Sequence, residues 1–253
     1  MMYTATSGPP SDETLESINA AASRLLATTS TLHGPDWLAD TVLPDWTRAH
    51  VAAHLVLNSE AMVAVLDGMH SGVPTPMYLS DASRDTAIDV LAAEDPAAIT
   101  KRLQAGGVAF ADAVRRVPTE AWSGSFGRLP DGPPMPAGAV IGMRRREIEI
   151  HHADLGAGYG PGDWPGPFVA ELLDTMAADH ASSGPFLVTA TDLGRTWQVG
   201  GSVGPEVSGT GADLAWWLLG RAQSSDLRCD WGPRCVSEEL PAIGPWRRSP
   251  HQK

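Results

Sequence analysis

The sequence predicts an α+β protein in which a four-helix bundle precedes a small α+β domain. Apolar residues recur at helical spacing in four long segments of the first 157 residues. A glycine- and proline-rich run, residues 158–167, then interrupts the pattern. Beyond it, short strand-like segments lie between two helical ones. We therefore predict a bundle over residues 11–160 and a second domain over residues 166–253.

The composition is that of a globular protein with an acidic surface. Of the 253 residues, 43% are hydrophobic and 19% are charged, which is enough to bury a substantial core. The net charge of -12 argues against a surface for nucleic acid or anionic membrane. No secretory signal or apolar run of about 20 residues is evident, so we expect a cytoplasmic protein. Cys229 and Cys235 are too few for a disulfide framework and read as ordinary thiols.

The first two predicted helices cover residues 11–32 and 46–68. Ser11 is a good N-cap, and the two acidic residues that follow it suit the positive end of the helix dipole. In the second helix, His50 and His54 stand one turn apart beside an apolar stripe. That spacing permits metal binding, although taken alone such a pair is more often structural.

The third and fourth long helices are predicted after two loops. Residues 71–82 form a loop, residues 84–93 a short helix, and Asp95-Pro96 begins a helix that Pro118 ends. A second loop, 123–136, leads to residues 143–156, MRRREIEIHHADLG. Ile148 and Ile150 alternate as in a strand, but no partner strand lies nearby, so we predict a helix. An up-and-down four-helix bundle follows.

The second domain is predicted to contain two helices and short strands. The helices cover residues 168–182 and 210–221, and the strands cover 186–191 and 195–199, with a third candidate at 206–208.

The candidate site is built on Glu147 and His151, which lie one turn apart on the same helix face. Two ligands are too few for a useful metal site, and His54 on a facing helix would be the third. Two imidazoles and one carboxylate leave a coordination position open, as in catalytic zinc sites. The same donors also accept iron, manganese or nickel. Periodicity alone does not show that the two helices face each other.

Other polar residues around this stretch have simpler interpretations. Residues 144–146, three arginines, cannot all face one site, and at least one is expected to be solvated. His152 points away from the face of His151 and is expected near the site or at the surface. Asp154 either orients a ligand or pairs with an arginine. His50 is expected on the helix face rather than at the metal.

Five segments together resemble the mycothiol-dependent maleylpyruvate isomerase family. They are LPDWTRAHVAAHL, TPMYLSDASR, PTEAW, MRRREIEIHHADLG and LLGR, in this order between about Leu43 and Arg221. That family is similar to the DinB-like metal-binding four-helix bundles, with a small α+β domain added. The resemblance implies that His54, Glu147 and His151 bind the metal. It also implies that Arg221 is the functional arginine of the C-terminal domain.

The implied reaction is a cis–trans isomerisation of a small anionic substrate, on the gentisate route of aromatic degradation. The thiolate of mycothiol, a cosubstrate, adds to the double bond of maleylpyruvate, the single bond rotates, and elimination gives fumarylpyruvate. Zinc would lower the pKa of the thiol, and Arg221 would hold a substrate carboxylate. Arg84 is a weaker candidate for a second carboxylate or for the thiol cosubstrate. We expect a monomer.

Two other functions fit the same residues. One is a zinc-dependent mycothiol S-transferase that acts on another electrophile, because it would use the same metal and thiol. The other is a non-catalytic metal-binding protein, in which replacement of Arg221 would have no effect.

Overall fold

The computed structural model describes residues 8–201, 204–221, 226–231 and 239–243, and it divides the chain into two compact units at Gly160. The first unit is mostly helical and the second combines helices with a sheet, so the predicted α+β class is confirmed. The helices of the first unit are α1 (Asp12–Ser30), α2 (Arg48–Ser71), α3 (Asp81–Ala92), α4 (Pro96–Arg116) and α5 (Ala139–Asp154).

Three of these helices begin where a short polar side chain caps the first turn. Ser11 Oγ accepts a hydrogen bond from the Thr14 amide at 3.2 Å, and Ser80 Oγ accepts one from the Ser83 amide at 3.0 Å. Asp95 Oδ1 accepts from the amide of Ala97 at 2.8 Å, directly before Pro96. Each cap satisfies an amide that has no partner within the helix, which fixes where the helix starts.

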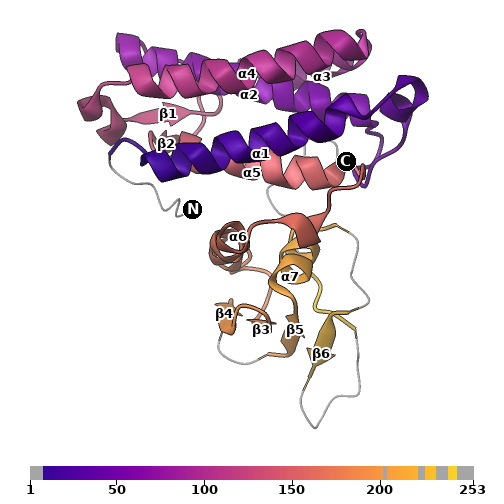
Figure 1. Ribbon diagram of the computed structural model, residues 1–253. Helices are drawn as coiled ribbons and strands as arrows, with labels where there is room; N and C mark the ends of the chain where they lie inside the picture. The colour runs from indigo at the N-terminus through magenta and orange to yellow at the C-terminus, as the bar shows by residue number, and fades with distance from the viewer. Residues whose placement is uncertain (1–7, 202–203, 222–225, 232–238, 244–253) are drawn as a thin grey trace. The chain divides into compact units, whose positions relative to one another are not determined.

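The four long helices pack in an order that the sequence did not predict. Helix α1 packs against α4 and α5, and helix α2 packs against α4, α3 and α5 (Figure 1). The expected up-and-down order, in which consecutive helices are neighbours, is therefore wrong for α1 with α2 and for α4 with α5. The segment between them includes the 3₁₀ turn Gly34–Leu38 and is long enough to carry the chain across the bundle.

Helix α2 is the central core helix of the first unit. Most of its side chains are buried, including Val51, Leu55, Met62 and Leu66. By length and hydropathy it could cross a membrane, contrary to the expectation that no apolar segment of about 20 residues is present. However, 72% of its most apolar window is buried inside the protein, as expected for a helix surrounded by other helices.

Helices α2 and α4 approach closely at Gly106. Ser59 Oγ donates to the Gly106 carbonyl at 3.0 Å, and a Cβ on Gly106 would lie 2.9 Å from that Oγ. At Gly107, by contrast, a Cβ would meet only Ala22 Cβ at 4.0 Å.

The two glycines therefore make a matched test of this contact. Gly107→Ala is expected to raise the free energy of unfolding by about 0.5–1 kcal/mol, because alanine is the better helix former. Gly106→Ala is expected to lower it by about 1–2 kcal/mol, because overpacking outweighs that gain. Urea unfolding measures both, and equal effects would show that the helices separate freely here.

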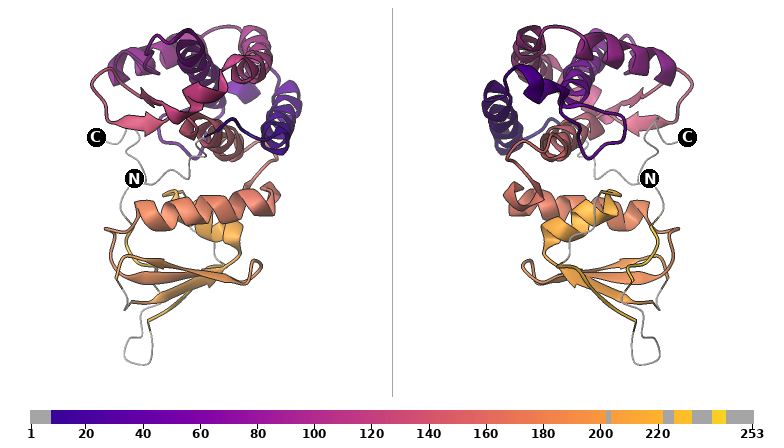
Figure 2. Two further views of the ribbon diagram at one scale, coloured as in Figure 1. Left: turned by 90° about the vertical axis from the view of Figure 1, so that its left-hand side faces the viewer. Right: turned by 90° about the vertical axis from the view of Figure 1, so that its right-hand side faces the viewer.

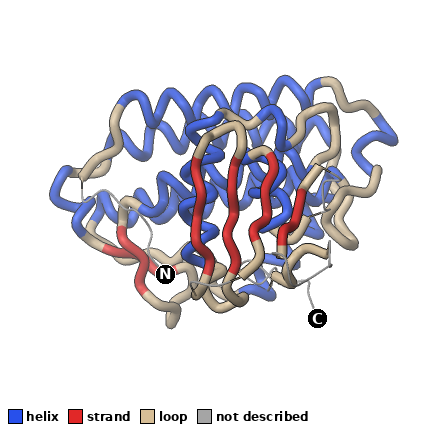
Figure 3. The backbone as a smooth tube through the Cα atoms, turned by 90° about the horizontal axis from the view of Figure 1, so that it is seen from below, coloured by secondary structure: helices blue, strands red, loops and turns tan. Residues whose placement is uncertain are grey.

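The second unit is a four-stranded sheet covered on one face by two helices. The strands β3 (Phe186–Ala190), β4 (Arg195–Val199), β5 (Glu206–Gly209) and β6 (Arg228–Asp230) lie in the order β4-β3-β5-β6. Only β3 and β5 pair in parallel. Figure 3 shows the strands of the sheet side by side, and Figure 2 shows α6 (Gly166–Asp179) and α7 (Gly211–Leu218) together on one face of it.

Three strands were not predicted. They are β6 and the hairpin of β1 (Ser125–Gly127) and β2 (Pro134–Pro136) within a predicted loop. A strand of three residues is too short to show alternation. Cys229 lies in β6, whereas Cys235 lies outside the described residues.

Candidate metal centre

Helices α2 and α5 bring His54, Glu147 and His151 together inside the first unit. One ligand atom from each lies within 4.8 Å of the other two. His54 Nε2 is 2.8 Å from Glu147 Oε2, and His151 Nε2 is 3.4 Å from the same oxygen. The two imidazole rings meet edge to face, with centroids 4.6 Å apart. The structure therefore shows that α2 and α5 face each other, which periodicity in the sequence could not show.

The local sequence of α5 explains why a polar cluster sits on a buried helix. Ile148 and Ile150 are both buried, at 0% and 4% exposure, so the helix packs on more than one side. This two-sided burial produces the strand-like alternation in the sequence. Glu147 and His151 share the remaining face and are only partly exposed, so a small molecule can reach them.

Burial and mutual hydrogen bonds set the charges of the three groups. Burial lowers the pKa of His54 to about 4, and Arg84 adds to this effect. Burial would lower the pKa of His151, but hydrogen bonds with Asp154 and Glu147 outweigh it and raise that pKa to about 9. Burial would raise the pKa of Glu147, but both histidines hold it well below its usual range. At neutral pH the cluster therefore holds one carboxylate, one neutral and one protonated imidazole.

Asp154 orients His151, as one of its two predicted roles required. Its Oδ2 lies 2.8 Å from His151 Nδ1, and the aspartate side chain is fully buried. The two residues are three positions apart in the same helix, so their side chains are neighbours on its surface. A carboxylate behind a ligating histidine fixes the tautomer and the ring orientation, so Nε2 is directed at Glu147.

Asp154→Asn is expected to weaken zinc binding by about 10–100-fold, the usual effect of losing such a partner. The amide is nearly the same size but carries no charge to hold the histidine. Competition with a chromophoric chelator measures the dissociation constant. Asp89→Asn is the control, because Asp89 is exposed and 3.8 Å from His50. Unchanged zinc affinity in Asp154→Asn would show that the aspartate only packs.

Arg84, at the start of α3, reaches the same site. Its Nη2 lies 3.1 Å from His54 Nδ1, its Nη1 donates to Asp85 at 2.8 Å, and its side chain is only 9% exposed. Arg84, the weaker candidate of the sequence analysis, therefore contacts the cluster. Tyr78 lies beside it, with guanidinium groups of Arg84 and Arg128 at 5.7 and 5.4 Å from its ring centre.

Two residues near the cluster were not singled out from the sequence. They are Asn58, which is buried, and Tyr78, whose hydroxyl accepts from Asn58 Nδ2 at 3.5 Å. Burial raises the pKa of Tyr78, and the charge of Glu147 raises it further. The position of Asn58, one turn beyond His54 on α2, was the signal that could have identified it.

The remaining polar residues of the two helices serve the fold. His50 bonds Thr47 Oγ1 at 2.8 Å and caps α2, as expected for a residue away from the metal. His152 does point away from the cluster, but it is fully buried, which corrects the expectation of a place near the site or at the surface. Its ring stacks on Tyr159 at 3.7 Å, and its Nε2 bonds Thr28.

The arginine run is less solvated than expected. Arg144 is 2% exposed, packs 5.9 Å from the Phe110 ring centre and donates to the Leu55 carbonyl at 3.4 Å. Arg145 and Arg146 are half-buried. The expectation that at least one of the three meets solvent is compatible with the partial exposure of Arg145 and Arg146, although none of the three is fully exposed.

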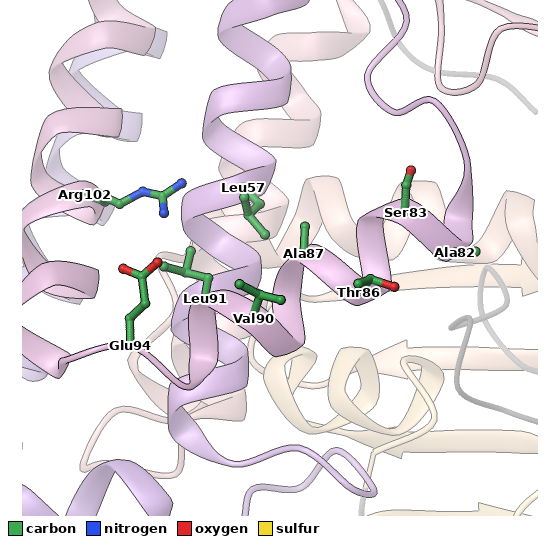
Figure 4. Close-up of a pocket in the computed structure, with 9 residues that line it drawn as sticks. All are labelled: Leu57, Ala82, Ser83, Thr86, Ala87, Val90, Leu91, Glu94 and Arg102. Carbon is green, nitrogen blue, oxygen red and sulfur yellow. The ribbon is translucent and has the colours of Figure 1, made fainter.

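A groove of about 580 Å³ along α3 lies away from these groups. Its lining is mostly apolar, with Ser83 and Thr86 on α3 and with Glu94 and Arg102 at one end (Figure 4). Arg102 is already paired with Glu60 at 2.9 Å. No member of the histidine–glutamate cluster lines the groove. The cluster rather than the groove is the candidate site, because size alone does not supply reactive groups.

The cluster fits a divalent metal ion on the chemistry of its donors. Two imidazole nitrogens and one carboxylate oxygen converge from two packed helices, and Asp154 supports one imidazole from behind. This is the donor set of catalytic zinc sites, which leave a position for water or substrate.

Comparison with known proteins places the chain in a family. Residues 18–156 match the mycothiol maleylpyruvate isomerase N-terminal domain, and residues 163–237 match the C-terminal domain of the same proteins. The chain belongs to the mycothiol maleylpyruvate isomerase family. Both domains of the family are therefore present, in the family's order. No curated protein matches the chain.

Two solved structures have a fold similar to that of this chain. The chain is similar to a crystal structure of the mycothiol-dependent maleylpyruvate isomerase, with a TM-score of 0.83 and 24% identity. The match covers 94% of this chain and 97% of that chain. A histidine-to-alanine mutant of a mycothiol-dependent maleylpyruvate isomerase matches equally well.

Arg221 belongs to the second unit, directly after α7. Gly220, at φ 73°, ends the helix, and the Arg221 amide donates to the Trp216 carbonyl at 3.2 Å. The half-buried side chain donates to the Leu219 carbonyl through Nη1 at 3.3 Å. The role of Arg221 as a carboxylate-binding residue stays a prediction.

Proposed function

We propose that this protein is a mycothiol-dependent cis–trans isomerase that converts maleylpyruvate to fumarylpyruvate. The observation that carries the proposal is the convergence of His54, Glu147 and His151 within 4.8 Å, in a chain that matches both family domains. The family name supplies the thiol and the substrate, and the cluster supplies a place for the reaction.

In this proposal His54, Glu147 and His151 hold one divalent metal ion, with zinc as the first candidate. When bound, such an ion lowers the pKa of a thiol that coordinates it, so thiolate is available at neutral pH. Asp154 keeps the His151 ring oriented, and Trp46, with its ring 5.6 Å from that of His54, shields the site from one side.

The chemistry itself proceeds on the substrate. Mycothiol thiolate forms a bond to one carbon of the cis double bond, and the electron pair moves onto the adjacent carbonyl as an enolate. Rotation about the new single bond follows, and collapse of the enolate expels the thiolate and gives the trans product. Arginine suits both ends of this cycle, because its planar fork binds carboxylates and favours enolate charge. Arg221 is proposed for that role, and Arg84 for a second carboxylate or for the thiol cosubstrate.

The test is the loss of maleylpyruvate absorbance with purified protein, with and without mycothiol, together with metal analysis. We expect conversion only with mycothiol and about one zinc per chain, the count that one three-ligand site implies. A zinc-loaded protein that leaves maleylpyruvate unchanged would contradict the isomerase. Transfer of mycothiol to a different electrophile would then identify an S-transferase on the same site.

A further inference from the structure

The contact between Arg84 and His54 has a consequence for the metal site. Arg84 Nη2 lies 3.1 Å from His54 Nδ1, while His54 Nε2 lies 2.8 Å from Glu147 Oε2. A guanidinium group donates hydrogen bonds and accepts none. His54 Nδ1 must therefore be the acceptor in this contact, and the ring hydrogen is on Nε2, where it is donated to Glu147.

A metal ion on His54 Nε2 requires the opposite arrangement. The ligating nitrogen needs its lone pair, so the ring hydrogen moves to Nδ1, and Nδ1–H then requires an acceptor. Arg84 would present a second donor to that hydrogen at a buried position, where two opposed donors repel. The Arg84–His54 contact and a metal on Nε2 thus cannot be satisfied together.

We infer that metal binding at His54 releases Arg84 from His54, so that Arg84 and the metal compete for this histidine. The structure gives the released side chain a place to go. A cavity of about 240 Å³ borders Arg84 and is lined also by Met77, Tyr78 and Leu79. Asp85 already accepts a hydrogen bond from Arg84 Nη1 at 2.8 Å, and it can keep this bond while Nη2 turns away from His54.

This inference deepens the proposed function and rests on it in one respect. If the enzyme binds an anionic substrate at the loaded metal, the released guanidinium becomes available to a carboxylate only in the metal-bound protein. Arg84 is then a substrate-binding residue whose availability depends on the metal, and an empty site would not hold the anion there.

The experiment measures zinc dissociation constants by competition with a chromophoric chelator. Arg84→Gln removes the opposed donor and offers an amide oxygen to His54 Nδ1–H. The variant is expected to bind zinc about tenfold more tightly than the natural protein, because changes to a residue that hydrogen-bonds a metal ligand have effects of this size. Arg84→Lys keeps the charge and the donors and should stay close to the natural value.

Arg128→Gln is the matched control. It removes the same charge from the other guanidinium beside the Tyr78 ring, at 5.4 Å, and Arg128 pairs with Asp81 rather than His54. We expect less than a twofold change. Equal tightening in Arg84→Gln and Arg128→Gln would overturn the inference, because charge alone would then explain it. Unchanged or weaker zinc binding in Arg84→Gln would also overturn it.

A structure of the zinc-loaded protein provides the second measurement. The distance from Arg84 Nη2 to His54 Nδ1 should exceed hydrogen-bonding range, and retention of the 3.1 Å contact with zinc on Nε2 would overturn the inference. Neither measurement involves maleylpyruvate. The inference can therefore fail while isomerase activity is found, or hold while it is absent.

Discussion

His54→Ala is expected to lose both bound zinc and isomerase activity. Only two ligands would remain, both on α5, and the donor from α2 would be missing. Loss of an outer-shell partner weakens metal binding by about 10–100-fold, so loss of a direct ligand should exceed that range. Metal analysis after dialysis and the maleylpyruvate assay measure the two effects. Full turnover by a metal-free His54→Ala protein would contradict the mechanism.

His50→Ala is the matched control for this prediction. It removes the same side chain one turn earlier on the same helix, where His50 bonds Thr47 and caps α2. The cost should be about 1 kcal/mol of stability, as for other caps, with zinc content unchanged. Metal analysis together with a circular dichroism melt of the metal-free proteins separates lost stability from lost metal.

Arg221→Ala is expected to lose activity while zinc stays bound. Arg221 lies in the second unit, outside the cluster proposed to hold the metal, so the zinc content should be unaffected. If the guanidinium holds a substrate carboxylate and the developing enolate charge, kcat/KM should fall by about 10²–10³-fold. Steady-state kinetics measures this, and Arg221→Lys should recover only part of it, because lysine cannot make the bidentate contact.

The control for Arg221 is Arg195→Ala in the same unit. Arg195 is about half exposed and pairs with Asp174 at 2.8 Å, a surface ion pair of small energy. Its kinetics should match those of the natural protein. Full activity in Arg221→Ala would instead show that a different residue binds the substrate carboxylate, whereas no activity even in the natural protein would favour a protein that binds metal without this chemistry.

Much of the fold could be predicted because its signals are local. Caps such as Ser11 and Asp95 fixed the starts of α1 and α4, and the apolar stripe defined α2. The order of the helices could not be predicted, because it depends on how the segment between α1 and α2 crosses the bundle. The three-residue strands were missed because no periodicity develops over so short a length.

The candidate site was likewise predictable where its signals are local and not where they depend on long-range contacts. Helical spacing put Glu147 and His151 on one face, but the approach of His54 from α2 is a long-range contact that no local pattern contains. Family resemblance supplied it. The burial of His152 was missed for a related reason, because its stacking partner Tyr159 and its hydrogen-bond partner Thr28 come from other segments.

The proposed ligands come from two helices, α2 and α5, and this also affects the stability of the folded protein. His54 and Glu147 are 93 positions apart in the chain, so an ion bound by both would act as a cross-link that closes most of the bundle into one loop. An ion that binds only the folded protein raises its stability in proportion to the logarithm of its free concentration. Replacement of a ligand would therefore lower both turnover and the melting temperature, and a chelator alone would lower the melting temperature of the natural protein.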